Sequence, residues 1–158
     1  MKLNKLMFRE YDIRGIWNED ITEEISYHIG RAYATKLLSF GKNKMIVGYD
    51  NRLSSPIIEE KLVKGLTEGG VNVVRLGLVT TPMYYYAWDK LNIHAGIMIT
   101  ASHNPKEYNG FKMSYNGIHN MFGKDVSDLY YVIINGIYSE GNGTIEYADI
   151  KEDYVKMI

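Results

Sequence analysis

Three short apolar runs that alternate with helical patterns constrain the fold of this 158-residue chain more than any other feature. The runs at 45–50, 71–76 and 95–99 are rich in Val, Ile and Met, which is typical of strands buried on both faces. The helical patterns that precede or separate them lie at 21–40, 56–68 and 83–91. This alternation predicts an α/β fold with three layers, α/β/α, around a mostly parallel sheet.

A fourth apolar run makes the predicted sheet mixed. The run at 111–115 ends at Asn116-Gly117, the strongest short turn signal in the sequence. We therefore expect one antiparallel strand at the sheet edge and about four main strands in all. A last helical pattern at 124–135 ends at Gly136.

Length and composition narrow the class of protein. The length favours one domain, and we expect it to span 1–140, with a linker and the start of a further domain at 141–158. A net charge of -1 gives no basic field for nucleic acid, and the absence of cysteine excludes disulfides and thiolate metal sites. No run is long and apolar enough for a membrane span. We expect a cytoplasmic protein with neither a nucleic-acid nor a membrane partner.

The polar loop that follows the third apolar run holds the candidate chemistry. Open α/β sheets place their sites at the carboxyl ends of strands, where this loop would lie. Ser102 is a candidate nucleophile, the adjacent His103 suits proton transfer, and Lys112 brings a charge that can face an anion. Spacing alone also fits a polar turn in which Ser102 is only a local cap, and such turns are the more frequent case.

Three motifs carry a resemblance to a known family. The stretch 100–105 reads TASHNP and is followed by YNGFK at 108–112, which resembles the phosphoserine loop of the α-D-phosphohexomutases. That family includes phosphoglucomutase, phosphomannomutase and phosphoglucosamine mutase. The stretches 11–15 (YDIRG) and 48–55 (GYDNRLSS) are similar to its two preceding motifs. Three motifs in the same order outweigh the interpretation of a plain polar turn.

The resemblance implies a mechanism centred on Ser102. In the family, the loop serine carries a phosphoryl group, hands it to a hydroxyl of a hexose phosphate, and takes one back from the bisphosphate intermediate. The phosphate on Ser102 would be a ligand of Mg²⁺, and a sugar bisphosphate of the glucose 1,6-bisphosphate type would be the activator. Phosphoserine brings nearly two negative charges, so cations are needed close by.

The resemblance also assigns the neighbouring residues. Arg14 and Lys112 would be the cations, and His103 a proton-transfer or positioning group. Tyr11 and Asn104 would line the phosphate and substrate site. Asp50 and Arg52 are expected to form a structural pair beneath the loop, and structural roles are also expected for the scattered histidines, His28, His94 and His119.

The chain resembles only the first of the four domains that these enzymes normally have. The other metal ligands, the sugar-recognition loop and a further phosphate-binding loop would belong to the missing domains, which are expected partners. We therefore expect the isolated chain to be inactive as a mutase. A non-catalytic module that binds a phosphosugar, or a fragment that only associates with other domains, stays open as an alternative.

Overall fold

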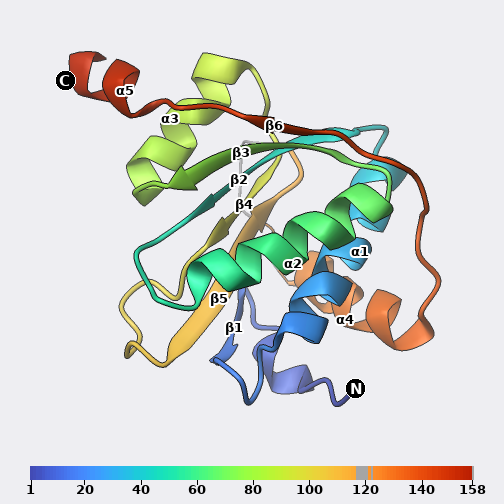
Figure 1. Ribbon diagram of the computed structural model, residues 1–158. Coiled ribbons are helices and arrows are strands. Elements are labelled where there is room, and N and C mark those ends of the chain that lie inside the picture. Colours follow the sequence, from blue (N-terminus) through green and yellow to red (C-terminus); the bar gives the residue numbers. More distant parts are fainter. Residues whose placement is uncertain (117–120, 122, 158) are drawn as a thin grey trace.

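A mixed sheet divides the molecule into two layers of helices (Figure 1). The computed structural model describes residues 1–157 except 117–120 and 122. Within these residues the sheet has six strands, in the order β1-β5-β4-β2-β3-β6. Their bounds are Ile13–Ile16 for β1, Lys44–Tyr49 for β2, Asn72–Leu78 for β3, Gly96–Ile99 for β4, Tyr108–Ser114 for β5 and Ile145–Tyr147 for β6.

The strand directions confirm the α/β class and the mixed sheet but correct two details. Strands β4, β2, β3 and β6 are mutually parallel, and β5 runs antiparallel to both of its neighbours. The antiparallel strand is not at the edge, because β1 pairs along its outer side, with Ile13 opposite Phe111. The strands number six rather than about four in the described chain. The additional β1 and β6 have four and three residues, too few for a hydrophobic period to show.

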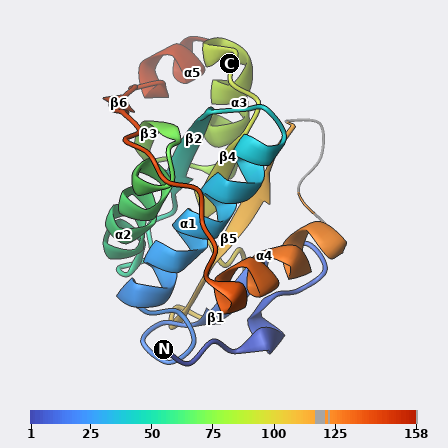
Figure 2. The ribbon, with the colours of Figure 1, turned by 90° about the vertical axis from the view of Figure 1, so that its right-hand side faces the viewer.

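Helices cover both faces of the sheet (Figure 2). On one face lie α1 (Glu23–Ser39), α2 (Ser55–Glu68) and α4 (Lys124–Asn135), and on the other α3 (Thr81–Leu91) and α5 (Lys151–Met157). A short 3-10 helix, η1 (Lys5–Met7), precedes β1. Threonines cap two of the helices: Thr22 accepts a hydrogen bond from the amide of Ile25, and Thr80 accepts one from that of Met83.

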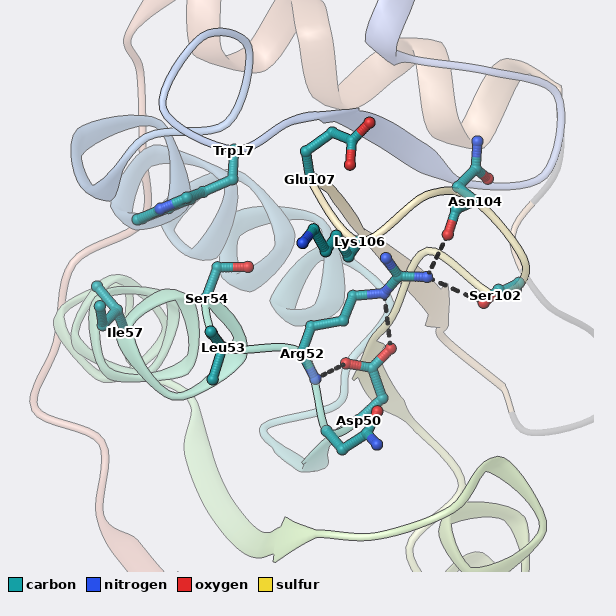
Figure 3. A pocket seen from close by; sticks show the side chains of 11 residues that line it. Trp17, Asp50, Arg52, Leu53, Ser54, Ile57, Ser102, Asn104, Lys106 and Glu107 are labelled. Carbon is teal, nitrogen blue, oxygen red and sulfur yellow. Dashed lines mark hydrogen bonds and ion pairs between the residues drawn. The ribbon is translucent and has the colours of Figure 1, made fainter.

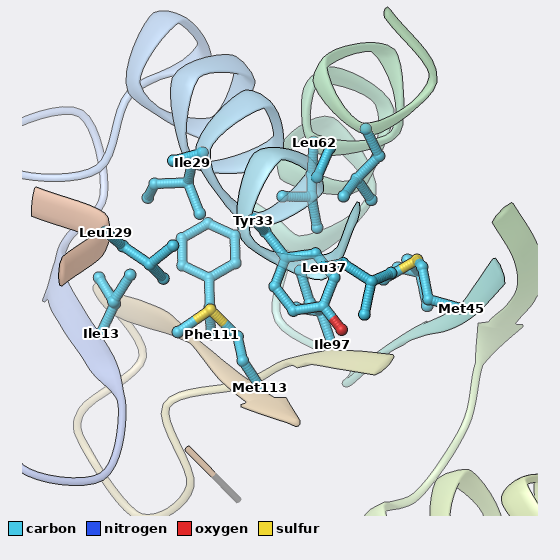
Figure 4. Packing of buried hydrophobic residues seen from close by; sticks show 14 of the residues in the cluster. Ile13, Ile29, Tyr33, Leu37, Met45, Leu62, Ile97, Phe111, Met113 and Leu129 are labelled. Atoms are coloured by element: carbon cyan, nitrogen blue, oxygen red, sulfur yellow. The ribbon is translucent and has the colours of Figure 1, made fainter. Parts of the chain in front are cut away.

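The core lies between the sheet and the α1, α2 and α4 layer (Figure 4). Met45 of β2 points into this layer, whereas the adjacent Ile46 points into a smaller cluster beneath α3. Both side chains are fully buried, which explains the continuous apolar run of this strand. Phe111 and Met113 of β5 pack in the larger cluster with Leu129 of α4. The carboxyl ends of β2 and β4 are thus fixed by packing on both faces.

The segment after α4 returns to the sheet. It crosses the ends of α1 and α2, and β6 then pairs with β3, with Val73 opposite Ile145. Residues 145–147 therefore belong to the same sheet as the rest, while a domain boundary near 140 remains a prediction. The turn expected at Asn116-Gly117 and the role expected of His119 fall on residues outside the described part. In that part, no helix has the length and apolar character needed to cross a membrane.

Candidate active site

The loop at the carboxyl end of β4 presents Ser102 in a tight turn. The Ser102 amide donates to the Thr100 hydroxyl at 3.0 Å, and the Asn104 amide donates to the carbonyl of Ala101, also at 3.0 Å. Ser102 has a φ of 53°, a left-handed conformation that residues other than glycine seldom adopt. Its side chain is half-buried, whereas Ala101 behind it is fully buried. The turn therefore holds the half-buried Ser102 at the surface, next to the buried Ala101.

A cleft of about 800 Å³ lies beside this turn (Figure 3). Ser102 and Asn104 line one wall, and the loop after β2 lines the other. Trp17 and Ile57 add apolar surface to the lining, and Lys106 and Glu107 add charges. Ser102 and Asn104 are the predicted site residues that line this cleft. A volume of this size is ample for a hexose phosphate.

Arg14 lies next to the loop and is only partly committed to other partners. Its Nε atom donates to the Asp12 carboxylate at 2.6 Å, and its Nη1 atom donates to the side-chain oxygen of Asn104. The Asp12 side chain is nearly buried, so it orients the guanidinium from behind. Two of the five N–H groups of Arg14 are used in this way. The other donors have no partner among the described residues and are free for an anion.

Lys112 lies on the same face of the sheet as Arg14. Arg14 is opposite Gly110 in the β1–β5 pair, and Lys112 is the next residue of β5 on that face. Phe111, which lies between Gly110 and Lys112 in β5, points to the other face, into the core. In the described part of the chain the ammonium group of Lys112 has no hydrogen-bond or ion-pair partner. Two cations that have unused donors within the described part of the chain thus lie on one face of the sheet, and their assignment to the phosphate stays a prediction.

His103 and Tyr11 are exposed, and the structure does not bring them into contact with Ser102. His103 follows Ser102 in the turn, and Tyr11, 67% exposed, precedes β1. Neither side chain has a hydrogen-bond partner among the described residues. Their assignment to proton transfer and to the substrate site stays a prediction.

Asp50 and Arg52 form the expected structural pair beneath the loop. Arg52 Nε lies 3.2 Å from an Asp50 carboxylate oxygen, and the Arg52 amide donates to the other oxygen at 3.1 Å. Sequence reasoning missed how far this pair reaches, since the guanidinium also donates to four backbone carbonyls of the 102–108 segment. The sequence does show two opposite charges, Asp50 and Arg52, two residues apart at a strand end. This pattern does not reveal that the partners of Arg52 include backbone carbonyls of the serine loop.

Asn109 is a second anchor that the sequence did not single out. This residue at the start of β5 is fully buried. Its side-chain amide donates to the hydroxyls of Ser54 and Ser55, at 2.8 and 3.0 Å, and its oxygen accepts from the Gly110 amide at 2.8 Å. Ser55 begins α2, and Ser54 occupies the N-cap position without a side-chain capping hydrogen bond. The start of α2 is therefore joined to the end of the Ser102 loop.

The described residues alone do not form a closed metal site. No group of three or more His, Cys, Asp or Glu side chains among them is arranged to hold a cation. His28 instead lies 2.8 Å from the Tyr138 hydroxyl, and His94 is exposed near Asp89. Ser102 is the group of this chain that suits Mg²⁺, since a phosphate on its hydroxyl would offer the oxygen ligands that this ion prefers.

This fold and loop define a class of domain: a three-layer α/β domain that presents a serine in the loop after β4, with Arg14 bonded to Asn104 of the same loop and Lys112 on the strand that follows it. Comparison with known proteins identifies the family. Residues 5–130 match the family model for "Phosphoglucomutase/phosphomannomutase, alpha/beta/alpha domain I". The chain belongs to the phosphoglucomutase/phosphomannomutase family, as the three motifs predicted.

Relatives and solved structures agree with this family. A phosphoglucomutase of Neisseria meningitidis is 40% identical over 96% of this chain, and a phosphomannomutase/phosphoglucomutase of Pseudomonas putida is 39% identical over the same share. A crystal structure of a family member from Burkholderia thailandensis superposes with a TM-score of 0.92 at 32% identity, over 98% of this chain. The chain spans 33% of the length of the two relatives and 35% of the solved chain.

Proposed function

We propose that this chain carries the phosphoryl group of a phosphohexomutase on Ser102. The observation that supports this most directly is the placement of Ser102 in a left-handed turn at a cleft, beside Arg14, whose guanidinium has unused donors. A planar guanidinium suits two oxygens of a phosphate, and the Lys112 ammonium adds a point charge on the same face.

The reaction has two phosphoryl transfers. In the first, the bond between the Ser102 oxygen and phosphorus breaks while a free hydroxyl of the hexose phosphate bonds to phosphorus, giving a hexose bisphosphate. The proton of that sugar hydroxyl is released, and the resemblance assigns the transfer of this proton to His103. The bisphosphate then reorients, and its other phosphate returns to Ser102. Arg14 and Lys112 stabilise the charge on the transferring oxygens throughout.

Mg²⁺ is the cofactor that this chemistry calls for. When bound, it would neutralise charge on the phosphoryl oxygens, with the Ser102 phosphate as its ligand from this chain. A glucose 1,6-bisphosphate-type activator would reload Ser102 if the phosphate is lost. Whether glucose, mannose or glucosamine phosphate is preferred is not decided by this chain, because the resemblance places the sugar-recognition loop in another domain.

Peptide mapping of the full-length protein isolated from its host tests the proposal. We expect phosphate on Ser102, and we expect Ser102→Ala to abolish the interconversion of hexose 1-phosphate and 6-phosphate. A protein that never carries phosphate at Ser102, together with full activity of the Ser102→Ala variant, would overturn it. The 158-residue chain alone is expected to show no turnover.

A second function is supported by the share of the relatives that the chain spans, 33%. With a third of the length, the chain by itself would bind phosphosugars without converting them. Titration of glucose 1-phosphate, followed by NMR at Arg14 and Lys112, tests this. Binding in the millimolar range or tighter without turnover is the expected result, and spectra without any shift would rule it out.

A further inference from the structure

The guanidinium of Arg52 is fully used in holding the Ser102 loop. An arginine has five N–H groups, and each one of Arg52 has an acceptor within 3.2 Å. The acceptors are the carbonyls of Ser102 and Asn104 for Nη2, those of Pro105 and Tyr108 for Nη1, and the Asp50 carboxylate for Nε. Four of the five are thus backbone atoms of the loop that carries the serine, and Figure 3 shows the contacts of Arg52 with Ser102, Asn104 and Asp50.

Arg52 is itself held from the other side. The Asp50 carboxylate accepts from Arg52 Nε and, with its second oxygen, from the Ser55 hydroxyl at 2.8 Å. The Arg52 side chain is 11% exposed, so these contacts form where water competes little. The chain of contacts runs from the start of α2, through Asp50 at the end of β2, to the serine loop at the end of β4. The loop therefore takes its position from the rigid part of the sheet.

The contacts act where the backbone is strained. A left-handed conformation at a residue other than glycine is unfavourable and persists only when the surroundings impose it. Arg52 Nη2 bridges the carbonyls of Ser102 and Asn104, on either side of His103. Removing this bridge leaves the turn free to relax, and the Ser102 hydroxyl then loses its direction.

Comparison with Arg14 separates two roles for the two arginines. Arg14 has donors without a partner in the described part of the chain, whereas Arg52 has none left for a ligand. We propose that Arg52 is a positioning residue for phosphoryl transfer: it fixes the left-handed turn that aims the Ser102 hydroxyl, without touching the phosphate. This inference rests on the proposed function, and its geometric part can be tested apart from it.

Arg52→Lys is the decisive variant, because it keeps the charge and loses the planar fork. A lysine has three N–H groups on one nitrogen and cannot serve five acceptors spread around a plane. In the full-length protein we expect kcat to fall by about 100-fold, the usual effect of displacing a reacting group by about 1 Å, with KM little changed. Arg14→Lys, by contrast, is expected to raise KM as well, since that side chain would contact the phosphate.

Arg75→Lys is the matched control. Arg75 of β3 is also a partly buried arginine, paired with the Glu59 carboxylate, but its partners among the described residues, Glu59 and Tyr147, lie outside the serine loop. We expect this variant to lower the melting temperature while kcat per folded molecule stays unchanged. If Arg52→Lys behaves in the same way, losing stability but no kcat, Arg52 is only structural and the inference is wrong.

Hydrogen exchange in the 158-residue chain tests the geometry without any activity. The Asn104 amide bonds to the Ala101 carbonyl, and the Tyr108 amide bonds to that of Pro105. Both should exchange at least about tenfold faster in Arg52→Lys than in Arg75→Lys, given the strength of hydrogen bonds to a charged donor. Unchanged exchange overturns the inference. Absence of phosphate on wild-type Ser102 overturns the proposed function alone, because the exchange result still decides whether Arg52 holds the loop.

Discussion

Gly30 of α1 and Gly65 of α2 bring the backbones of their two helices into direct contact. A Cβ atom added at Gly30 would lie 2.3 Å from the carbonyl oxygen of Leu62 and 3.1 Å from the Cα of Gly65. A Cβ atom added at Gly65 would lie 2.1 Å from the carbonyl oxygen of Tyr27. Neither glycine has a positive φ, so it is close approach and not backbone conformation that requires them. Helices α1 and α2 are therefore closer together than a side chain larger than that of glycine would permit at these two positions.

Gly65→Ala is expected to force the two helices apart. Overpacking of this kind costs about 1–3 kcal/mol of the free energy of unfolding, because backbone atoms cannot move aside as a flexible side chain can. Urea denaturation measures the change. Lys64→Ala, at the exposed neighbouring position, is the control and should stay within about 0.5 kcal/mol of the wild type. Equal stability of Gly65→Ala and the wild type would show that the helices are not in contact as described.

Lys112→Met should separate activity from stability. The Lys112 ammonium has no partner in the described chain, so removing its charge should leave the melting temperature nearly unchanged. Loss of one group that stabilises transition-state charge typically lowers kcat about 100- to 1,000-fold. Mutase assays of the full-length protein measure this, with Lys64→Met as the control for a change of net charge. A variant that keeps its kcat would remove Lys112 from the site.

Asn109→Ala tests the link between α2 and the serine loop. The substitution removes three hydrogen bonds and leaves the Gly110 amide and two serine hydroxyls to find other partners. Leaving one buried polar group unsatisfied costs about 1–3 kcal/mol, so we expect a loss of at least that size in the free energy of unfolding. Ser139→Ala, at a half-buried position, removes the hydrogen bond from the Ser139 hydroxyl to the Gly69 carbonyl and a weaker 3.3 Å contact with the Thr35 hydroxyl, and should cost less. A loss for Asn109→Ala no larger than for Ser139→Ala contradicts the role given to this residue.

The sequence predicted the strands and helices whose hydrophobic pattern extends over enough residues to be recognised. The run at 45–50 is apolar on both faces because Met45 and Ile46 enter different clusters, and the structure has a buried strand there. Strand β6 could not be predicted, because its three residues are all exposed and too few to show a hydrophobic period, and the pairing of β6 with β3 joins distant parts of the chain. Interior placement of β5 likewise depends on β1, which is distant in the sequence.

The candidate site shows the same division. Arg14, Ser102 and Lys112 were identified by their motifs, and the structure places Arg14 and Lys112 on one face of the sheet, with Arg14 bonded to Asn104 of the loop that carries Ser102. The motif gave no sign of the acceptors of Arg52, since they are carbonyls that any residue has. Asn109 was inside a motif, but only the fold shows that its amide reaches two serines 54 and 55 residues away. Contacts with backbone atoms leave no trace in side-chain chemistry.

His28 makes the stability of the protein depend on pH near neutrality. Burial is the main cause that lowers the pKa of this histidine below its ordinary value of about 6.5, and the nearby Arg31 acts in the same direction against the opposing effect of Glu24. Its ring nitrogen Nδ1 lies 2.8 Å from the Tyr138 hydroxyl, which joins α1 to the segment after α4. The folded protein therefore favours the neutral ring.

The direction of the effect follows from which state binds the proton first. As the pH falls through about 6.5, the unfolded chain takes up a proton at this position while the folded chain does not, so unfolding becomes more favourable. The contribution of His28 is fully present above that pH and is lost as the pH falls toward the lower pKa of the folded state. Urea denaturation between about pH 5 and pH 7 should show stability rising with pH, and His28→Gln should reduce that slope. His94→Gln, at an exposed position, should preserve it; if instead both variants leave the slope as in the wild type, the pH dependence arises from other groups.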